Sequence, residues 1–367
     1  MKNSNLANAK RVKNDEFYTQ YGDIQKEIDA YLEYNPDVFR GKVVYCNCDD
    51  PFESNFFRYF VLNFNKLGLK QLITTSYKPS PVANMELPLY GDDKTLTKSK
   101  SRPKVTANKF IINEVKDIDG DGEFNLKDVA RQLKANKNNE WTPLEKDGDF
   151  RSSECVKLLE QSDIVVTNPP FSLFKEYVKQ LFDNNKKFVI IGNKNSVTYK
   201  EIFPLIKDNK MWSGKTEWSG GLWFVTMDNG DVDRVIDGVN MKNVSSVWFT
   251  NIDHGRRHQP LPLMTMKENL KYSKHKEIKG KKAYDKYDNY DAIEVSFTDA
   301  IPSDYDGVMG VPISFLDKYN PEQFEIIGMA EDNGKGFSGG IWDGKNPHCV
   351  INGENKFKRI FIKRKKK

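Results

Sequence analysis

The side chains that most clearly suggest chemistry lie in one short run: Asn168, Pro169, Pro170 and Phe171. An apolar segment, residues 163–167, precedes the run and is typical of a buried strand. The two prolines remove backbone donors and fix the chain, and an aromatic ring follows them. In a doubly wound sheet, ligands bind beyond the carboxyl ends of the strands, where Asn168 is expected. Such a rigid segment suits a site in which an amide side chain and backbone carbonyls converge on one amino group.

Methyl transfer to the 6-amino group of adenine is chemistry that these residue types fit. That nitrogen is a poor nucleophile, because its lone pair is delocalised into the ring. The Asn168 side-chain oxygen and the Pro169 carbonyl can accept hydrogen bonds from both amino hydrogens, which aims the lone pair without a strong general base. Phe171 can stack on the base, which must be flipped out of a duplex at a cost of about a few kcal/mol. A proline-stiffened turn with an incidental asparagine is the alternative.

Two further segments have features of a nucleoside-binding site. Residues 43–56 predict a strand, a tight polar loop and a helix, although the loop lacks the glycines common at such a turn. Asp149 and Phe150, which follow Gly148, could hold an adenosyl group with a carboxylate and an aromatic ring. A third segment, residues 15–20, places an aromatic pair and a threonine before a helix. By itself this pattern is typical of a hydrophobic staple with a threonine cap.

Short β-rich runs alternate with amphipathic helical stretches through the first two thirds of the chain, as an α/β doubly wound domain requires. Strands are expected at residues 42–46, 71–76, 109–115, 163–167, 187–192, 222–227 and 247–250. Helices are expected at residues 23–33, 54–67, 126–133, 154–161 and 173–184. The last third is turn-rich and lacks long periodic helices, so a boundary is expected near His254.

These motifs, in their order, resemble the EcoRI-type family of adenine-specific DNA methyltransferases. The resemblance rests on the runs DEFYTQ, YCNCDDPFESNFF, GDFRSSE and DIVVTNPPFSLFKEYV. It continues through YDNYDAIEV, DYDGVMGVPISFLDKYNPEQFEIIG and RIFIKRK, so that it covers nearly the whole chain. It implies an α/β fold with a Rossmann-like class I methyltransferase sheet and a smaller C-terminal target-recognition region. Residues 1–255 would form the S-adenosylmethionine-dependent methyltransferase domain, and residues 256–367 the DNA-binding region.

The family resemblance also implies site residues. The active-site clamp would be formed by Asn168, Pro169, Pro170 and Phe171. The residues that it implies for binding the cofactor, S-adenosyl-L-methionine, are Phe17, Tyr18, Thr19, Cys48, Asp49, Asp50, Pro51, Asp149, Phe150 and Asn168. The loop after the first strand departs from the wider class because it has no glycine, so its individual cofactor contacts stay open.

The order of the motifs implies that the segment after about His254 reads double-stranded DNA. The four residues expected to make the contacts are Arg256, Arg257, His258 and Gln259. Arginine and glutamine are the side chains best shaped for bidentate contact with guanine and adenine edges. A polar surface loop is the alternative. The net charge of +5 is modest, but basic residues gather at 271–282 and 356–367, where they can neutralise phosphates or form a solvated surface.

Residues 117–128 have the ligand spacing of a calcium loop, with Gly122 at the sharp turn and Asp128 where a glutamate is usual. The preceding residues 109–115 predict a strand rather than a helix, so an EF-hand is not expected. A solvated Asp-Gly turn before a helix is favoured over a calcium or magnesium site. No metal is therefore assigned.

Composition indicates a soluble cytoplasmic protein. The N-terminus is polar, and no stretch approaches the roughly 20 apolar residues that span a bilayer, so no membrane partner is expected. Four cysteines in 367 residues suggest neither a disulfide framework nor paired zinc knuckles. Reduced and mostly buried thiols are favoured.

The expected function is site-specific methylation of DNA adenine, in a restriction-modification system or in a phage or mobile element. A cognate restriction endonuclease that acts on the same site, without a stable complex, is one further expected partner. An Asn-Pro-Pro run followed by an aromatic residue also occurs in methyltransferases of this fold that act on RNA adenine or on protein glutamine amides, so these substrates are the alternative. A DNA-binding module without catalysis is disfavoured by the intact clamp at Asn168.

Overall fold

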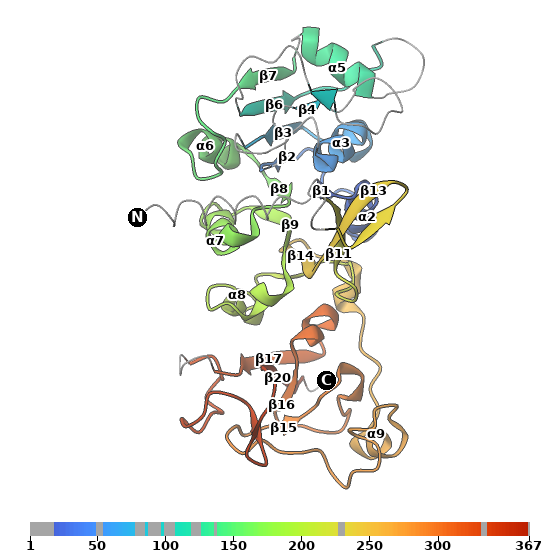
Figure 1. Ribbon diagram of the computed structural model, residues 1–367, viewed down its shortest axis with the longest axis vertical. Helices are drawn as coiled ribbons and strands as arrows, with labels where there is room; N and C mark the ends of the chain where they lie inside the picture. The colour runs from blue at the N-terminus through green and yellow to red at the C-terminus, as the bar shows by residue number, and fades with distance from the viewer. Residues whose placement is uncertain are drawn as a thin grey trace. The chain divides into compact units, whose positions relative to one another are not determined.

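The computed structural model describes residues 18–48, 54–77, 85–86, 97–98, 107–118, 126–135, 138–226, 232–331 and 336–365. The chain divides into two compact units, each with β-sheet structure (Figure 1). The first unit comprises Met1–Ser196 and Gly214–His254, and the second comprises Val197–Ser213 and Gly255–Lys367.

The first unit is built on a large mixed sheet whose strands follow the order β14-β9-β8-β2-β3-β6-β7. Strands β9, β8, β2 and β3 run parallel to one another, whereas β14 and β6 are antiparallel to their neighbours. The bounds are β2 Val43–Cys46, β3 Gln71–Thr75, β6 Asn108–Ile112, β7 Glu140–Pro143, β8 Ile164–Thr167, β9 Lys187–Asn193 and β14 Ser246–Thr250. Every residue of β2 and β8 is buried, as expected for central strands covered on both faces.

Helices cover both faces of this sheet. Figure 1 shows α6 and α7 on one side of the strands, and α2 and α3 on the other. The bounds are α2 Tyr21–Tyr34, α3 Asn55–Leu62, α4 Phe64–Leu67, α5 Leu126–Ala135, α6 Ser153–Gln161 and α7 Phe174–Asp183. Serine side chains start two of them: Ser54 accepts hydrogen bonds from the first backbone amides of α3, and Ser152 accepts one from α6.

A smaller antiparallel sheet of the first unit holds the N-terminal segment. Its order is β1-β11-β13-β12, with bounds β1 Tyr18–Thr19, β11 Leu222–Val225, β12 Arg234–Ile236 and β13 Val239–Val244. Thr19 of β1 pairs with Phe224 of β11, so the N-terminal motif is fixed by a strand far away in the sequence. A separate pair is formed by β4 Met85–Glu86 and β5 Thr97–Lys98.

The second unit contains a sheet of order β15-β16-β20-β17. Its strands are β15 Ile293–Glu294, β16 Met309–Pro312, β17 Phe324–Met329 and β20 Arg359–Arg364, and β18 Val350–Ile351 pairs with β19 Glu354–Asn355. Helical segments and a short strand complete it: α8 Phe203–Lys207, β10 Trp212–Ser213, η3 Gly255–His258, α9 Met266–Tyr272, η4 Thr298–Ala300 and η5 Ile313–Lys318. A 3-10 turn, η2 Lys194–Thr198, leads out of the first unit.

The basic C-terminal run 356–367 differs from the surface patch that its charge suggests. Over Arg359–Arg364 it is an inner strand of the second sheet, and Ile360, Phe361 and Ile362 are fully buried. The apolar residues in the middle of this run decide its place, because burying them outweighs leaving a short basic segment in water.

The mixed α/β fold with a large mixed sheet is confirmed, and so are most expected elements. The strands expected near residues 42–46, 71–76, 109–115, 163–167, 187–192, 222–227 and 247–250 are β2, β3, β6, β8, β9, β11 and β14. The helix expected at 54–67 is interrupted at Asn63, where α3 ends and α4 begins. Within the described residues, no helix is long and apolar enough to cross a bilayer. All four cysteines are free thiols, and three of them are buried.

Candidate active site

The carboxyl ends of three parallel strands bring the candidate site residues to one edge of the large sheet. β2 pairs in parallel with both β8 and β3. The segments that follow these strands begin at Asn47, Ser76 and Asn168. This edge is where open α/β sheets bind their ligands.

Asn47 ties the loop after β2 to the proposed catalytic segment. Its backbone carbonyl accepts a hydrogen bond from the hydroxyl of Thr167, the residue directly before Asn168. Its side-chain oxygen accepts a hydrogen bond from the hydroxyl of Tyr177 on α7. Asn47 is 2% exposed, so both bonds are shielded from water. The positions of the two loops are therefore coupled through one buried residue.

Cys48 explains how a loop without glycine can make this turn. Its φ angle is 62°, in the left-handed region that glycine adopts most readily. Asn47, the residue before Cys48, is held by its two hydrogen bonds, and these fix the backbone where the left-handed residue begins. The other three residues expected here, Asp49, Asp50 and Pro51, lie outside the described residues.

The N-terminal motif lies beside the start of α3. The side-chain amide of Asn55, at the start of α3, donates to the carbonyl oxygen of Thr19 at 2.8 Å. Thr19 is 5% exposed, and its hydroxyl finds no hydrogen-bond partner within the described parts of the chain. Thr19 does not cap the following helix, because the N-cap of α2 is Gln20. Phe17 lies outside the described residues, and only the backbone of Tyr18 is described, in β1.

The segment Gly148, Asp149 and Phe150 approaches the end of β3. Gly148 has φ 78°, and a Cβ there would lie 1.9 Å from the carbonyl oxygen of Ser76, so no other residue fits without moving the backbone. The Asp149 carboxylate accepts hydrogen bonds from the Arg151 guanidinium at 2.9 and 2.7 Å, and this pairing lowers the pKa of Asp149. Asp149 is therefore held as an anion at the edge of the sheet.

Helix α7 also holds Phe150. The Phe150 ring is 3% exposed and packs edge-to-face on Tyr177, with ring centroids 5.0 Å apart. The Gln180 side chain donates to the Phe150 carbonyl at 3.1 Å. One helix thus supports the loop after β2 through Tyr177 and the Gly148 segment through both Tyr177 and Gln180.

The four clamp residues follow β8 as the sequence predicts. Pro169 is buried, whereas Asn168, Pro170 and Phe171 are partly exposed. Phe171 opens a short 3-10 turn, η1 Phe171–Leu173, and its ring packs against the main hydrophobic core. The Leu173 amide donates to the Pro170 carbonyl at 3.0 Å, which closes the turn and directs the chain into α7.

Sequence reasoning missed Asn47, Tyr177 and Gln180. A signal for Tyr177 does exist: it occupies an apolar position of an amphipathic helix, and a buried tyrosine hydroxyl needs a partner. Nothing in the local sequence identifies that partner as Asn47, 130 positions away.

The four residues expected to read DNA lie in or next to η3 of the second unit, and the two arginines are engaged in internal contacts. Arg257 is 8% exposed, and its guanidinium lies 3.7 Å from the centre of the Trp212 ring and bonds to Asn209. Arg256 forms an ion pair with Asp317 at 2.9 Å, with its side chain 17% exposed. These contacts favour a structural role for both guanidiniums.

The other two residues of that group are more accessible. His258 is partly exposed, and its Nδ1 lies 2.9 Å from a carboxylate oxygen of Glu322. Gln259 is exposed. Within this group, Gln259 is therefore the side chain best placed to meet an outside ligand.

Most of the calcium-like loop, residues 119–125, lies outside the described residues. Asp128, at its end, is fully buried in α5, and its carboxylate accepts a hydrogen bond from the Ile118 amide at 2.9 Å. This bond joins Ile118 and Asp128, which lie on either side of residues 119–125 in the sequence. Within the described parts of the chain, no group of three or more histidine, cysteine, aspartate or glutamate side chains could hold a metal ion.

The described residues fit a cofactor that presents hydroxyl and amino groups. The Thr19 hydroxyl is a buried polar atom that still needs a partner, and such atoms in folded proteins are nearly always satisfied. Asp149 supplies a fixed carboxylate, and the glycine at 148 lets the backbone come close to Ser76. These are groups that can hold the adenosyl and methionine parts of S-adenosylmethionine.

Comparison with known proteins shows the class to which this site belongs. The model of the family described as adenine-specific methyltransferase EcoRI matches residues 5–365. The Type II methyltransferase M.EcoRI of Escherichia coli is 43% identical over 370 residues, which cover 99% of this chain and 97% of that protein. The Type II methyltransferase M.MpnI of Mycoplasma pneumoniae is 36% identical over 326 residues, covering 87% and 83% of the two chains. No solved structure matches the chain.

The site and these matches define an adenine-specific DNA methyltransferase. The chain belongs to the EcoRI family of adenine-specific methyltransferases. A methyltransferase of this family implies S-adenosylmethionine as the methyl donor.

Proposed function

We propose that this enzyme methylates the 6-amino group of a flipped-out adenine within a specific site of double-stranded DNA, with S-adenosylmethionine as cofactor. The observation that carries this proposal is the link through Asn47, which joins the loop after β2 to Thr167 and so to Asn168. In a methyl-transfer enzyme, donor and acceptor must be held in line, and a rigid connection between their two loops serves that need.

The first unit has features of a Rossmann-like class I methyltransferase domain. Four parallel strands, β9, β8, β2 and β3, lie side by side with an antiparallel strand at β14. The strand order reverses between β2 and β8, because β3 leads away from β2 on one side and β9 continues from β8 on the other. Such a switch point is the usual ligand crevice of an open α/β sheet. We therefore assign residues 1–255 to the catalytic domain, apart from Val197–Ser213, which belong to the second compact unit.

The clamp residues orient the amino group of the target. The Asn168 side-chain oxygen and the Pro169 carbonyl accept one hydrogen bond each from the two amino hydrogens, which directs the nitrogen lone pair toward the donor. Bound S-adenosylmethionine supplies a methyl group on a sulfonium, an electrophile that a neutral amine can attack. Because the amino proton becomes acidic only as the methyl group transfers, Asn168 does not have to act as a base.

Phe171 offers a ring for the flipped base. It is partly exposed at the start of η1, while its inner side rests on the hydrophobic core. A ring supported in this way is fixed before the base arrives, so stacking does not require the protein to reorganise.

On the cofactor side, we assign Thr19, Cys48, Asp149 and Phe150 to S-adenosylmethionine binding. The family resemblance implies Asn168 as a cofactor contact as well, and we assign its side chain to the target amino group. Phe17, Tyr18, Asp49, Asp50 and Pro51 remain assigned through the family resemblance. The Phe150 ring is almost fully buried, so its backbone, held by Gln180, is the part best placed to touch a ligand.

Residues 256–367 are proposed to recognise the DNA target. Within the group 256–259, the structure favours Gln259 and His258 as contacts, with Arg256 and Arg257 as internal supports. The Type II names of the relatives support a place in a restriction-modification system in the cytoplasm, with a cognate endonuclease acting on the same site.

A comparison of substrates tests this proposal. Purified enzyme and tritiated S-adenosylmethionine are incubated with a library of DNA duplexes, with transfer RNA and with a glutamine-containing release factor. Label should enter DNA as 6-methyladenine within one short sequence. Equal or greater labelling of RNA or protein would contradict the proposal.

A further inference from the structure

Positive charge gathers in two segments of the second unit, residues 267–286 and residues 356–367. Residues 267–286 contain eight lysines against three acidic residues, which gives a net charge of +5. Residues 356–367 contain eight lysines and arginines and no acidic residue, and one of them, Arg359, is paired with Glu294. Residues 267–286 are thus one of two segments that attract a polyanion at long range.

The charges of this lysine segment, residues 267–286, face water. All eight of its lysines are exposed. Lys274 pairs with Asp299 and Lys281 with Asp285, at 2.8 and 2.5 Å. Among the described residues, the other six form no ion pair, and they are Lys267, Lys271, Lys276, Lys279, Lys282 and Lys286. Their ammonium groups are available to phosphates.

The start of the lysine segment is held by regular local structure. α9 begins with a capping box in which Thr265 and Glu268 each bond to the backbone of the other. The Glu268 carboxylate thus accepts hydrogen bonds at the helix start and, among the described residues, does not pair with a neighbouring lysine. After the helix, the Gly280 amide donates to the Leu270 carbonyl at 2.8 Å and folds the chain back on α9.

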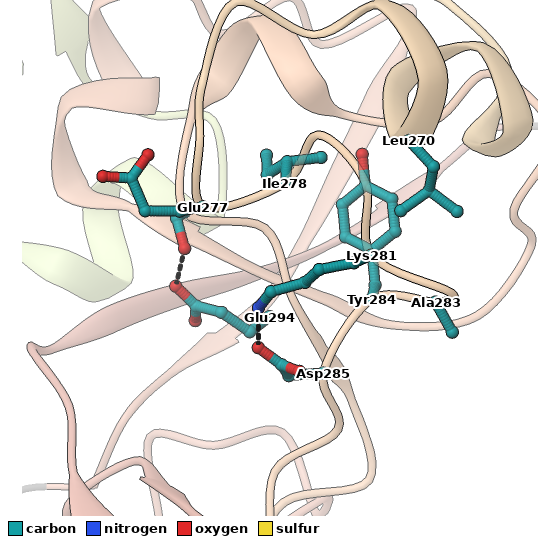
Figure 2. A pocket seen from close by; sticks show the side chains of 9 residues that line it. Leu270, Glu277, Ile278, Lys281, Ala283, Tyr284, Asp285 and Glu294 are labelled. Atoms are coloured by element: carbon teal, nitrogen blue, oxygen red, sulfur yellow. Dashed lines mark hydrogen bonds and ion pairs between the residues drawn. The ribbon is translucent and has the colours of Figure 1, made fainter.

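Buried and partly buried side chains hold the lysine segment in place. The His275 ring stacks on Phe297 with centroids 3.7 Å apart, and its Nε2 lies 2.8 Å from Asp299. Figure 2 shows Leu270, Ile278 and Tyr284 among the residues that line a small pocket formed largely by the segment itself. The Tyr284 hydroxyl donates to the Ala300 carbonyl at 2.6 Å. The lysines therefore project from a fixed surface.

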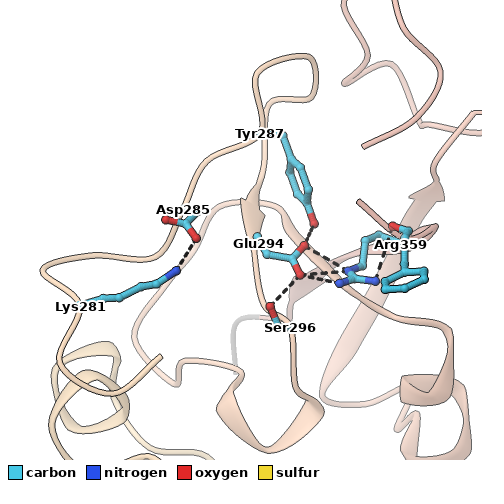
Figure 3. Close-up of polar contacts among 7 residues, drawn as sticks. Lys281, Asp285, Tyr287, Glu294, Ser296 and Arg359 are labelled. Atoms are coloured by element: carbon cyan, nitrogen blue, oxygen red, sulfur yellow. Dashed lines mark hydrogen bonds and ion pairs between the residues drawn. The ribbon is translucent and has the colours of Figure 1, made fainter. Parts of the chain in front are cut away.

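A buried ion pair lies in the unit that carries this surface and adds no net charge to it. Arg359 of β20 donates to Glu294 of β15 at 2.7 Å, and Glu294 also accepts hydrogen bonds from Tyr287 and Ser296 (Figure 3). Because the carboxylate and the guanidinium neutralise each other, this pair leaves the net positive charge of the lysine segment unchanged.

An exposed aromatic side chain stands among the lysines. Tyr272, the last residue of α9, is 60% exposed, and the Lys271 ammonium lies 4.7 Å from the centre of its ring. A tyrosine beside cations can pack on deoxyribose and donate its hydroxyl to a phosphate oxygen.

We propose that the lysine segment is a surface that binds the phosphate backbone of duplex DNA flanking the target adenine. The proposal rests on the proposed function and gives its DNA substrate a second contact region, separate from residues 256–259. A duplex fits better than a lipid surface, because the only large exposed apolar or aromatic side chain described within the segment is Tyr272. Binding here is independent of base sequence and strongly dependent on salt.

Three unpaired lysines provide the test: Lys271, Lys276 and Lys279 are changed together to glutamine. A matched control changes Lys42, Lys66 and Lys70, which are exposed and lie near the amino ends of β2 and β3, the edge opposite Asn168. Both variants lose three charges, so a difference between them reflects position. A third variant with arginine at 271, 276 and 279 keeps the charge.

Binding of the full-length enzyme to a methylatable and a scrambled duplex is measured between 50 and 300 mM salt. The glutamine variant should weaken both complexes by about tenfold or more at low salt and reduce the slope of log K against log salt by about two to three. Its kcat at saturating DNA should not change. The control and the arginine variant should behave like the wild-type enzyme.

Unchanged affinity and slope in the glutamine variant, with the wild-type enzyme methylating DNA, would overturn this proposal alone. Failure of the wild-type enzyme to methylate any duplex would instead contradict the proposed function. Anionic vesicles containing phosphatidylserine serve as a second probe. Tighter binding to them than to DNA, lost with the same three lysines, would also overturn the assignment.

Discussion

The hydroxyl of Tyr177 donates a hydrogen bond to the side-chain oxygen of Asn47, and the same tyrosine ring packs edge-to-face on Phe150. Tyr177 belongs to α7, which follows the clamp residues after the short turn η1. The loop after β2, the Gly148 segment and the clamp therefore share one support. A displacement of any one of the three segments should therefore also displace Tyr177 and, through it, the other two.

Replacing Tyr177 with phenylalanine should weaken cofactor binding several-fold, because Asn47 loses a buried partner while the ring stays on Phe150. An unsatisfied buried acceptor costs about 1–3 kcal/mol. The dissociation constant for S-adenosylmethionine is measured by calorimetry, and kcat is measured with both substrates saturating.

A double-mutant cycle with Asn47→Ala provides the control for that experiment. If the hydrogen bond carries the effect, the double variant should be little worse than Asn47→Ala alone. Additive losses, or an unchanged dissociation constant in Tyr177→Phe, would show that the two residues act independently.

Gly148→Ala should destabilise the protein more than Gly41→Ala. Both glycines have positive φ, 78° and 69°, but only the Cβ at 148 would collide with the Ser76 carbonyl, whereas the position at 41 is open. The left-handed conformation costs about 1–2 kcal/mol at each site, and the collision adds to this at 148. Urea unfolding of the two variants measures the difference, and equal losses would argue against the close approach.

Arg257→Ala should lower stability and weaken binding to all DNA sequences alike. The guanidinium is buried against Trp212 and bonded to Asn209, and a desolvated contact of this kind contributes about 2 kcal/mol. Lysine should not restore the loss, because it cannot stack in the same way. Thermal melting and competition between cognate and scrambled duplexes check this.

Gln259→Ala is the variant to compare with Arg257→Ala, since Gln259 is exposed and its side chain makes none of the described internal contacts. It should keep the melting temperature of the wild-type enzyme and lose about 1–3 kcal/mol of discrimination between cognate and non-cognate sites. If instead Arg257→Ala kept its melting temperature and lost discrimination between DNA sites, Arg257 rather than Gln259 would be the residue that contacts the bases.

Local patterns predicted the central strands and the helices of the first unit, because each of these elements buries one continuous apolar run or face. Examples are β8 and α7, which flank the clamp. The hydrophobic period and the length of each run are compatible with only one type of element. The placement of Asn168 at a strand end followed from the same reasoning.

Long-range pairings could not be predicted in this way. β1 is only two residues long and exists because β11 pairs with it. In β20, basic residues flank three apolar residues. The sequence does not show that the apolar residues are buried in an inner strand, whereas the second sheet does. Arg257 is of the same kind, since its burial against Trp212 depends on a segment more than forty residues earlier.

The central claim is that Asn168 orients the target amino group and does not bind the cofactor's sulfonium. Single-turnover methylation by Asn168→Ala, measured on a preformed complex of enzyme, S-adenosylmethionine and cognate duplex, tests it most directly. We predict that methyl transfer is lost while the dissociation constants of cofactor and DNA stay within about threefold of those of the wild-type enzyme. Near-native transfer by Asn168→Ala, or loss of transfer explained entirely by loss of cofactor binding, would contradict the claim.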